Sequence, residues 1–187
     1  TNPHAVVVED FDGDGLPDIL ILTFGKPHVY YFKNLGGLRF KDATAGSGLE
    51  GFEGAGTGLA VGDFDRDGDV DLLMTTNNGP ALLFRNDQHA GRKSLRVRLV
   101  GTRSNRDGIG ARVRIFYEGI SQTRLVKSGS SYLSQSELPV TFGVGTRDRV
   151  DRLVVEWPSG RTDEFPNVLA GRAYDLVEGN RLTPASA

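Results

Sequence analysis

An acidic motif occurs twice in the first half of this chain, and that repetition constrains the fold more than any other feature. The nine residues from Asp10 read Asp-Phe-Asp-Gly-Asp-Gly-Leu-Pro-Asp, and the nine from Asp63 read Asp-Phe-Asp-Arg-Asp-Gly-Asp-Val-Asp. The similarity continues, so that residues 18–34 align with 71–86 apart from one residue in a turn. A repeated segment of this kind is typical of folds that stack one supersecondary unit on the next. We therefore expect two copies of one small unit.

Each copy is predicted to consist of short β-strands around its acidic loop. The apolar clusters are short, partly β-branched and bounded by turn residues, a pattern that favours strands over helices. They lie at residues 5–8, 19–22 and 29–32 in the first copy and at 59–61, 72–74 and 81–84 in the second. A further strand is expected at Leu38-Arg-Phe40 in the first copy, and the second copy has no such tail.

The spacing of the acidic residues predicts a calcium site in each loop. Ca²⁺ takes six to eight oxygen ligands at ~2.3–2.6 Å, and a tight loop with carboxylates at positions 1, 3, 5 and 9 can direct them inward. A glycine at position 6 permits the sharp turn, and the residue at position 7 can add a carbonyl oxygen. The predicted ligands are Asp10, Asp12, Asp14, Leu16 and Asp18 for one ion, and Asp63, Asp65, Asp67, Asp69 and Asp71 for a second.

Other interpretations of these loops fit less well. An EF-hand needs a glutamate at position 12, where Ile21 and Met74 stand, and flanking helices instead of apolar strands. A solvated turn accounts for one Asp/Gly cluster, but a second match in an equivalent place disfavours that interpretation. The four carboxylates within one loop also repel one another strongly unless a cation neutralises them. Magnesium keeps most of its waters, and zinc or iron prefers nitrogen or sulfur. Whether Asp69 uses its side chain or its carbonyl stays open.

The second half has a different character. Residues 1–91 carry 14 acidic and 6 basic side chains, and residues 92–187 carry 10 acidic and 16 basic ones. Apolar and polar residues alternate in Leu95-Arg-Val-Arg-Leu-Val100, which predicts a half-buried strand. Further strands are expected at 111–117, 123–126, 140–142, 152–157 and 174–177. We predict an all-β chain with two domains: repeats at about 5–57 and 58–91 within residues 1–91, and a β-sandwich-like domain at 92–187.

These motifs resemble two known families. The two copies, with the tail Gly36-Gly-Leu-Arg-Phe40, resemble FG-GAP repeats, also called integrin α-like or VCBS repeats, whose blades build calcium-binding β-propellers. The segments Asn105-Arg-Asp-Gly-Ile-Gly-Ala-Arg112, Gly129-Ser-Ser-Tyr-Leu-Ser-Gln135, Phe142-Gly-Val-Gly145 and Val150–Gly160 resemble the ASPIC/UnbV domain of cartilage acidic protein relatives. The resemblance implies β-propeller-like blades and a secreted or cell-surface location.

Several functions are disfavoured. The chain has no cysteine, so thiol catalysis and disulfides are excluded, and no apolar run approaches the ~18 residues of a membrane span. The histidines are isolated, and no nucleophile elbow, zinc-protease motif or phosphate loop occurs. Arginines such as Arg96 and Arg98 alternate with apolar residues, which is typical of a solvated strand face and not of a nucleic-acid site.

We therefore expect a non-enzymatic, extracellular protein of structural or adhesive function, in which two calcium ions stabilise the loops. A propeller needs about four to eight blades, and fewer than two are present. The chain is therefore expected to be a piece of a larger propeller, to pack its two repeats on the second domain, or to assemble with protein partners or copies of itself through strand edges. The start at Thr1 is consistent with a processed or excised chain. Two alternatives stay open: a hydrolytic or carbohydrate-binding module, and a ligand-binding blade surface that does not self-assemble.

Overall fold

The computed structural model describes residues 2–185 apart from 25, 27, 53–55, 88–90 and 181. Every element of regular secondary structure assigned in these residues is a β-strand, which confirms the all-β prediction. Within the same residues, no helix has the length and apolar character that crossing a membrane requires. The strands are β1 (Pro3–Glu9), β2 (Asp18–Thr23), β3 (Val29–Asn34), β4 (Phe40–Asp42), β5 (Gly56–Gly62), β6 (Asp71–Thr76), β7 (Leu82–Phe84), β8 (Ser94–Val100), β9 (Arg112–Tyr117), β10 (Ile120–Leu125), β11 (Val140–Gly143), β12 (Arg149–Glu156), β13 (Thr162–Leu169), β14 (Arg172–Val177) and β15 (Leu182–Pro184).

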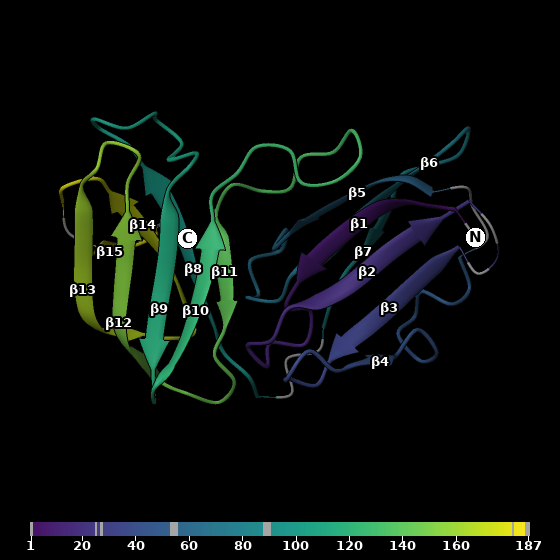
Figure 1. The fold of residues 1–187 in the computed structure, drawn as a ribbon, viewed down its shortest axis with the longest axis horizontal. Helices are drawn as coiled ribbons and strands as arrows, with labels where there is room; N and C mark the ends of the chain where they lie inside the picture. The colour runs from purple at the N-terminus through teal and green to yellow at the C-terminus, as the bar shows by residue number, and fades with distance from the viewer. Residues whose placement is uncertain are drawn as a thin grey trace. The chain divides into compact units, whose positions relative to one another are not determined.

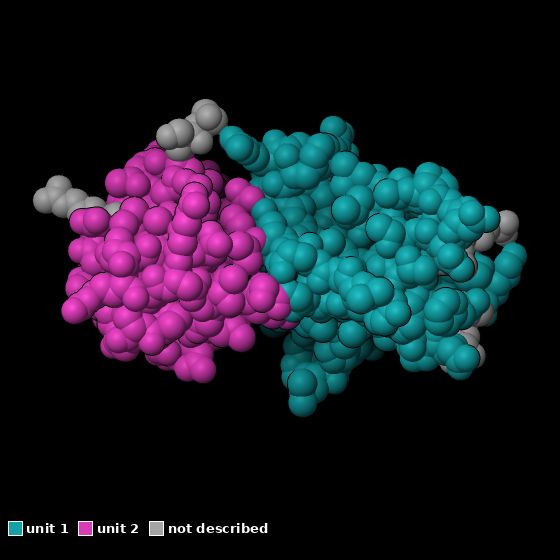
Figure 2. Space-filling model, turned by 90° about the horizontal axis from the view of Figure 1, so that it is seen from above, with its two compact units in different colours: residues 1–12, 16–88, 129–137 teal, residues 13–15, 89–128, 138–187 magenta. Residues whose placement is uncertain are grey.

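The strands form two compact units, which Figure 2 colours separately. Unit 1 comprises residues 1–12, 16–88 and 129–137, and unit 2 comprises 13–15, 89–128 and 138–187. Each half of the chain therefore contributes a short segment to the compact unit formed mainly by the other half. That residues 1–91 and 92–187 are separate domains stays a prediction.

Unit 1 contains two antiparallel sheets of the same design (Figure 1). The first has the strand order β1-β2-β3-β4 and the second has the order β5-β6-β7. Their registers correspond, since Glu9 lies opposite Asp18 in the first sheet and Gly62 lies opposite Asp71 in the second. Each acidic loop thus connects an equivalent pair of adjacent strands, which brings its first and last aspartates to the same end of a hairpin.

The core of unit 1 is built by alternate residues of these strands. On β1, Val7 is buried whereas Val6 and Val8 are 46% and 59% exposed, as expected for a strand with one face in a core. Leu20 and Leu59 are almost completely buried, and each such burial stabilises the fold by about 1.5–3 kcal/mol. The buried cluster consists of Ala5, Val7, Leu20, Leu22, Val29, Leu49, Leu59, Leu72 and Met74.

The last strand of the first sheet begins later than predicted. The expected last strand is present, but it spans Phe40–Asp42 instead of residues 38–40, because Leu38 lies in a turn at a φ of 58°, 93% exposed. Gly36 and Gly37 start this turn with φ values of 78° and 60°. Two consecutive glycines favour a left-handed turn, and the turn continues through the residue after them. In the second sheet, no strand of the described residues pairs with β7 on its outer edge.

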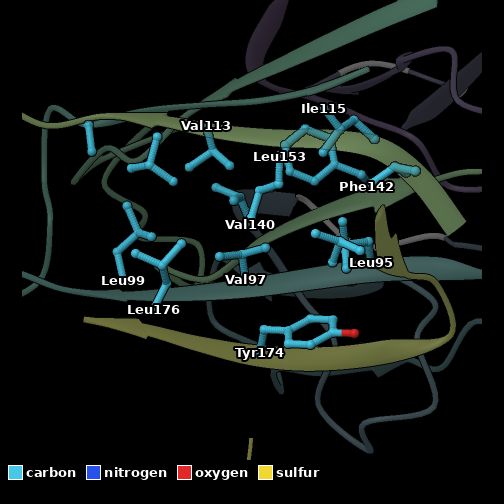
Figure 3. Close-up of a cluster of buried hydrophobic side chains, with 14 of the residues drawn as sticks. Leu95, Val97, Leu99, Val113, Ile115, Val140, Phe142, Leu153, Tyr174 and Leu176 are labelled. Atoms are coloured by element: carbon cyan, nitrogen blue, oxygen red, sulfur yellow. The ribbon is translucent and has the colours of Figure 1, made fainter. Parts of the chain in front are cut away.

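Unit 2 is a sandwich of two four-stranded sheets, as predicted. The sheet orders are β10-β9-β12-β13 and β11-β8-β14-β15, and β8 and β14 form a parallel pair. Both sheets contribute to one core, in which Val97 of β8 and Val113 of β9 are fully buried (Figure 3). The alternating arginines of β8 point away from this core, and Arg98 makes a bidentate ion pair with Asp175 at 2.7 and 2.6 Å.

Strands β13 and β15 were not expected from the sequence. β13 contains Pro166, and only Asp163 and Val168 of its eight residues are buried, so the alternation of apolar residues is weak. β13 pairs with β12 alone and forms the edge of its sheet, which is where a strand tolerates proline.

Candidate metal centres

The two acidic loops have the same backbone form at their tight turns. The residue at position 4 of each loop has a left-handed φ, 69° at Gly13 and 63° at Arg66. The glycine at position 6 is also left-handed, with φ values of 94° at Gly15 and 99° at Gly68. An arginine rarely adopts such a φ, because its Cβ then approaches the following carbonyl oxygen. The second loop thus has the same backbone conformation as the first, although its position 4 is an arginine and not the glycine that adopts a left-handed φ without strain.

Each loop brings three carboxylates together. In both groups, at positions 1, 3 and 9, one oxygen of each side chain lies within 4.8 Å of the others. The first group is buried throughout, whereas Asp65 in the second is exposed. The members are Asp10, Asp12 and Asp18 in the first loop and Asp63, Asp65 and Asp71 in the second.

The other predicted ligands lie outside these two groups. Asp14 is partly exposed and Asp67 is exposed. The carboxylate of Asp67 accepts a hydrogen bond from the backbone N–H of Asp69 at 2.9 Å, which supports the turn. The side chain of Leu16 is 36% exposed, which suits a residue whose predicted contribution is its backbone carbonyl. Their part in binding an ion stays a prediction.

Asp18 at position 9 also joins parts of the first repeat through hydrogen bonds. Its Oδ2 accepts hydrogen bonds from the Phe11 N–H at 3.3 Å and the Tyr31 hydroxyl at 2.8 Å. Its Oδ1 accepts one from the Asn34 N–H at 2.8 Å. Asp18 is completely buried, so these donors compensate the loss of hydration of its charge. The carboxylate ties the start of the acidic loop to the end of β3.

Asp71 repeats this arrangement in the second sheet. It accepts hydrogen bonds from the Phe64 N–H at 2.9 Å and the Asn86 N–H at 2.8 Å. The Asn86 side chain in turn donates to the carbonyl oxygen of Val70 at 3.2 Å, as Asn34 does to that of Pro17 at 2.8 Å. This structural function of the ninth residue was not predicted, although the matching asparagine at the end of each aligned segment was a signal for it.

A basic side chain also lies beside the aspartate at position 3 of each loop. Lys33 makes an ion pair with Asp12. Arg85, at the aligned position, has its Nε 3.9 Å from Asp65 and donates to Asp87 at 2.9 Å. These side chains neutralise part of the negative charge.

The donor set fits a hard divalent cation. Two carboxylates closer than 4.8 Å repel by about 3 kcal/mol or more at an effective dielectric constant of about 20. Each group offers oxygen ligands only, and neither histidine nor cysteine takes part. Calcium matches this chemistry, since it binds carboxylate and carbonyl oxygens in flexible geometries. The residues present can therefore hold the ion that the motif predicts.

A cavity of about 270 Å³ lies within unit 1 beside these loops. Aromatic side chains of Phe11, Tyr31 and Phe84 line it together with apolar residues of the core. Arg85 and Asn86, which follow β7, contribute polar groups. The cavity therefore borders the strand that lacks an outer neighbour in the second sheet.

Unit 2 contains a buried acid of a different kind. Glu178 is 3% exposed, and its Oε2 accepts the backbone N–H groups of Thr102, Arg103 and Ser104 at 2.7–2.9 Å. Its Oε1 accepts the hydroxyls of Ser104 at 3.0 Å and of Ser159. Burial raises the pKa of Glu178, but these hydrogen bonds outweigh it and hold the pKa well below the usual value. The sequence contains no motif that would have identified this residue.

Comparison with protein families agrees with the repeat structure. Residues 10–74 match the FG-GAP-like repeat, and residues 55–95 match the FG-GAP repeat. Residues 101–183 match the ASPIC and UnbV family. The chain therefore carries FG-GAP repeats followed by an ASPIC/UnbV domain, which confirms the resemblance found in the sequence.

Individual proteins are similar to parts of this chain. Cartilage acidic protein 1 of Homo sapiens is 33% identical over 130 residues, which cover 67% of this chain and 19% of that protein. The Mus musculus protein of the same name is 35% identical over 113 residues, covering 58% and 17%. The chain thus spans about one fifth of the length of these relatives. A solved structure described as a "putative cell adhesion protein" from Bacteroides ovatus aligns with 100% of this chain and 87% of its own, at 13% identity and a TM-score of 0.29.

Proposed function

We propose that this chain is a non-catalytic extracellular module with a structural or adhesive function, in which each FG-GAP repeat holds one Ca²⁺. The observation that carries the proposal is the recurrence of one three-carboxylate group at equivalent places of two equivalent hairpins. Extracellular calcium is millimolar and fills even weak sites of this type. The similarity to cartilage acidic protein 1 supports the same location.

Calcium would be held by the carboxylates at positions 1, 3 and 9, with further oxygens from positions 5 and 7. The ion supplies positive charge that offsets the repulsion within each group. Because that repulsion opposes folding, binding to the folded loops adds to the stability of the sheets that they join. The proposed ligands are Asp10, Asp12, Asp14, Leu16 and Asp18, and Asp63, Asp65, Asp67, Asp69 and Asp71.

Calorimetric titration of the chelator-stripped chain with Ca²⁺ tests this proposal. We expect two ions per chain, and one ion in each of the variants Asp12→Ala and Asp65→Ala. The variant Asp151→Ala, in a sequence region remote from both loops, is the control and should bind two. Absence of calcium binding to the folded wild-type chain at millimolar concentration would refute the proposal.

We also propose that copies of this chain associate through the outer edge of β7. The first sheet has four strands and the second has three, and β7 corresponds to β3, which is covered by β4. An edge strand presents unpaired N–H and C=O groups that can accept a strand from another chain. Leu83 of β7 is 50% exposed, which gives such a contact an apolar side chain.

Light scattering across a concentration series tests the association. The wild-type chain should form dimers or larger species, and Leu83→Pro should shift the distribution to monomers because proline removes an N–H and disfavours pairing. Ala45→Pro, in an exposed turn of the first repeat whose backbone is not left-handed, is the control for a proline at the surface. A wild-type chain that stays monomeric at high concentration would exclude the association and leave the calcium proposal intact.

A second candidate function is carbohydrate binding at the unit 1 cavity. Three aromatic side chains beside polar groups are a combination that suits the apolar faces and hydroxyls of a sugar. Binding to a glycan panel that is lost in Phe84→Ala, with both calcium sites still filled, would establish it.

A further inference from the structure

The segment 129–137 links β10 and β11 along the chain, yet it belongs to unit 1 (Figures 1 and 2). It contains the Gly129–Gln135 motif of the ASPIC/UnbV resemblance, for which the proposed function gives no use. The segment folds back on itself through a bridge between Ser131 and Ser134 and a 2.7 Å hydrogen bond between the Ser130 and Ser136 hydroxyls. It therefore has a defined form of its own.

This segment is seated against the outer edge of β5. The Glu137 N–H donates to the Val61 carbonyl at 3.0 Å, and the Val61 N–H donates to the Ser136 hydroxyl at 3.1 Å. Two residues further along, the Asp63 N–H donates to Oε1 of Glu137 at 3.1 Å. Successive outward-facing backbone groups of one edge are thus satisfied by neighbouring residues of the segment. The last of these groups belongs to the first aspartate of the second acidic loop.

The first repeat satisfies the equivalent group locally. There the Asp10 N–H donates to Oε1 of Glu9, the residue directly before it, at 3.2 Å. The residue directly before Asp63 is Gly62, which has no side chain to offer. The second loop therefore receives from Glu137, far along the chain, the carboxylate that the first loop receives from its own strand.

Gly62 also leaves the space that Glu137 occupies. A Cβ at position 62 would lie 3.2 Å from the Glu137 carboxyl carbon and 3.3 Å from its Cβ, which is tighter than ordinary contact. Gly62 does not have a left-handed φ, so its backbone conformation does not require glycine. Space for the segment is the physical reason for a glycine at position 62. The first loop thus has a glutamate directly before it, whereas the second loop has a glycine there and a glutamate supplied by the segment.

We propose that Glu137 is the positioning residue of the second cation site, replacing in this repeat the function of Glu9 in the first. By accepting a hydrogen bond from the Asp63 N–H, Glu137 fixes the backbone position of the first residue of the loop. Calcium binding to the second loop and packing of residues 129–137 on β5 therefore stabilise each other. The inference rests on the proposed calcium function. Its consequence is that the ASPIC/UnbV half of the chain controls the affinity of one calcium site and leaves the other unaffected.

The test isolates one loop at a time in the full chain. In an Asp12→Ala background, where only the second loop binds, Glu137→Ala should weaken Ca²⁺ affinity about tenfold, the effect of one hydrogen bond to a charged group. Glu137→Gln keeps an oxygen acceptor and should stay within about threefold of the background. In the Glu137→Ala chain, Gly62→Glu should recover most of the loss by restoring the local carboxylate.

The matched control is the first loop. In an Asp65→Ala background, Glu9→Ala should weaken the first loop by a similar factor, and Glu137→Ala should leave it unchanged. Unchanged second-loop affinity in Glu137→Ala would overturn the proposal. A Gln variant as weak as the Ala variant would also overturn it, because the carboxylate would then act through its charge and not through the acceptor that positions Asp63.

Hydrogen exchange separates failure of this inference from failure of the calcium function. With no calcium present, Glu137→Ala should still accelerate exchange of the Asp63 amide and of residues 129–137, and should leave the buried strands β2 and β6 protected. If the wild-type second loop binds no calcium but this acceleration occurs, the contact stands and the calcium function falls. If exchange at these sites is the same in both proteins, the seating of the segment on β5 is refuted.

Discussion

The two units accommodate buried acids in opposite ways. In unit 1, three carboxylates are gathered beside one another in each loop, and Lys33 and Arg85 lie close to the first and second group. In unit 2, Glu178 stands among five donors, and Asp163 accepts hydrogen bonds from the indole of Trp157, the N–H of Gly179 and the guanidinium of Arg161 at 2.6–2.8 Å. A buried charge needs compensation in either case. Unit 2 supplies it with donors of its own chain, whereas the carboxylate groups of unit 1 are the proposed sites of a cation.

The largest expected effect is the loss of stability in unit 1 when calcium is removed. An ion at about 100 times its dissociation constant stabilises the folded state by about 2.7 kcal/mol, so two ions contribute about 5 kcal/mol. In EDTA, hydrogen exchange should accelerate in β1, β2, β5 and β6 and stay slow in the unit 2 core. Trp157, the only tryptophan, is buried in unit 2, and its fluorescence should report a nearly unchanged unfolding temperature. Equal losses in both units would break the comparison.

The next effect concerns the two aspartates whose carboxylates accept hydrogen bonds from both the acidic loop and the end of a neighbouring strand. Asp18→Asn and Asp71→Asn should each destabilise unit 1 by about 2–3 kcal/mol, since an amide NH₂ then faces a backbone donor in a buried site. Unlike the loss of a ligand, this cost should persist in EDTA, where urea unfolding followed by circular dichroism can measure it. Asp14→Asn is the control, because it should matter only when calcium is bound. A cost of Asp18→Asn that vanishes in EDTA would show that calcium binding is the whole role of this residue.

A smaller effect is expected from pH in unit 2. Because the folded-state pKa of Glu178 is lowered, its stabilisation is present above the unfolded-state value of about 4.5 and is lost as pH falls towards the folded-state pKa. Urea unfolding followed by Trp157 fluorescence should therefore show decreasing stability below about pH 4.5. Glu178→Gln should lower stability at pH 7 and flatten this dependence, whereas Glu164→Gln at an exposed position should not. A wild-type chain equally stable at pH 3 and pH 7 would contradict the assignment.

The smallest effect separates the two acidic loops. Arg66→Gly should stabilise the second loop by about 0.5 kcal/mol, since relief of the left-handed strain exceeds the entropy that glycine adds to the unfolded chain. Gly13→Ala should destabilise the first loop by about 1 kcal/mol for the same reason. Both changes can be measured by chemical unfolding in saturating calcium. A destabilising Arg66→Gly would mean that the arginine side chain contributes more than its backbone costs.

Local patterns were sufficient to predict most strands and both loops. The clusters at residues 19–22 and 72–74 were predicted as strands and lie in β2 and β6, because short apolar runs bounded by turn residues favour strands. The strand at 38–40 was misplaced because the turn of Gly36 and Gly37 extends through an apolar residue. β13 was missed because an edge strand buries too little to impose a pattern.

What the sequence by itself determined is the repeated unit, since spacing along the chain dictates which oxygens a short loop can gather. The equivalence of Asp10 with Asp63 and of Asp18 with Asp71 follows from that spacing alone. Only the tertiary structure decided how the remaining charges and edges are satisfied: which backbone groups surround Glu178, and that Glu137 reaches the start of the second loop where Gly62 leaves room. Such partners are far apart in the chain, and no local pattern records a contact that depends on how distant strands pack.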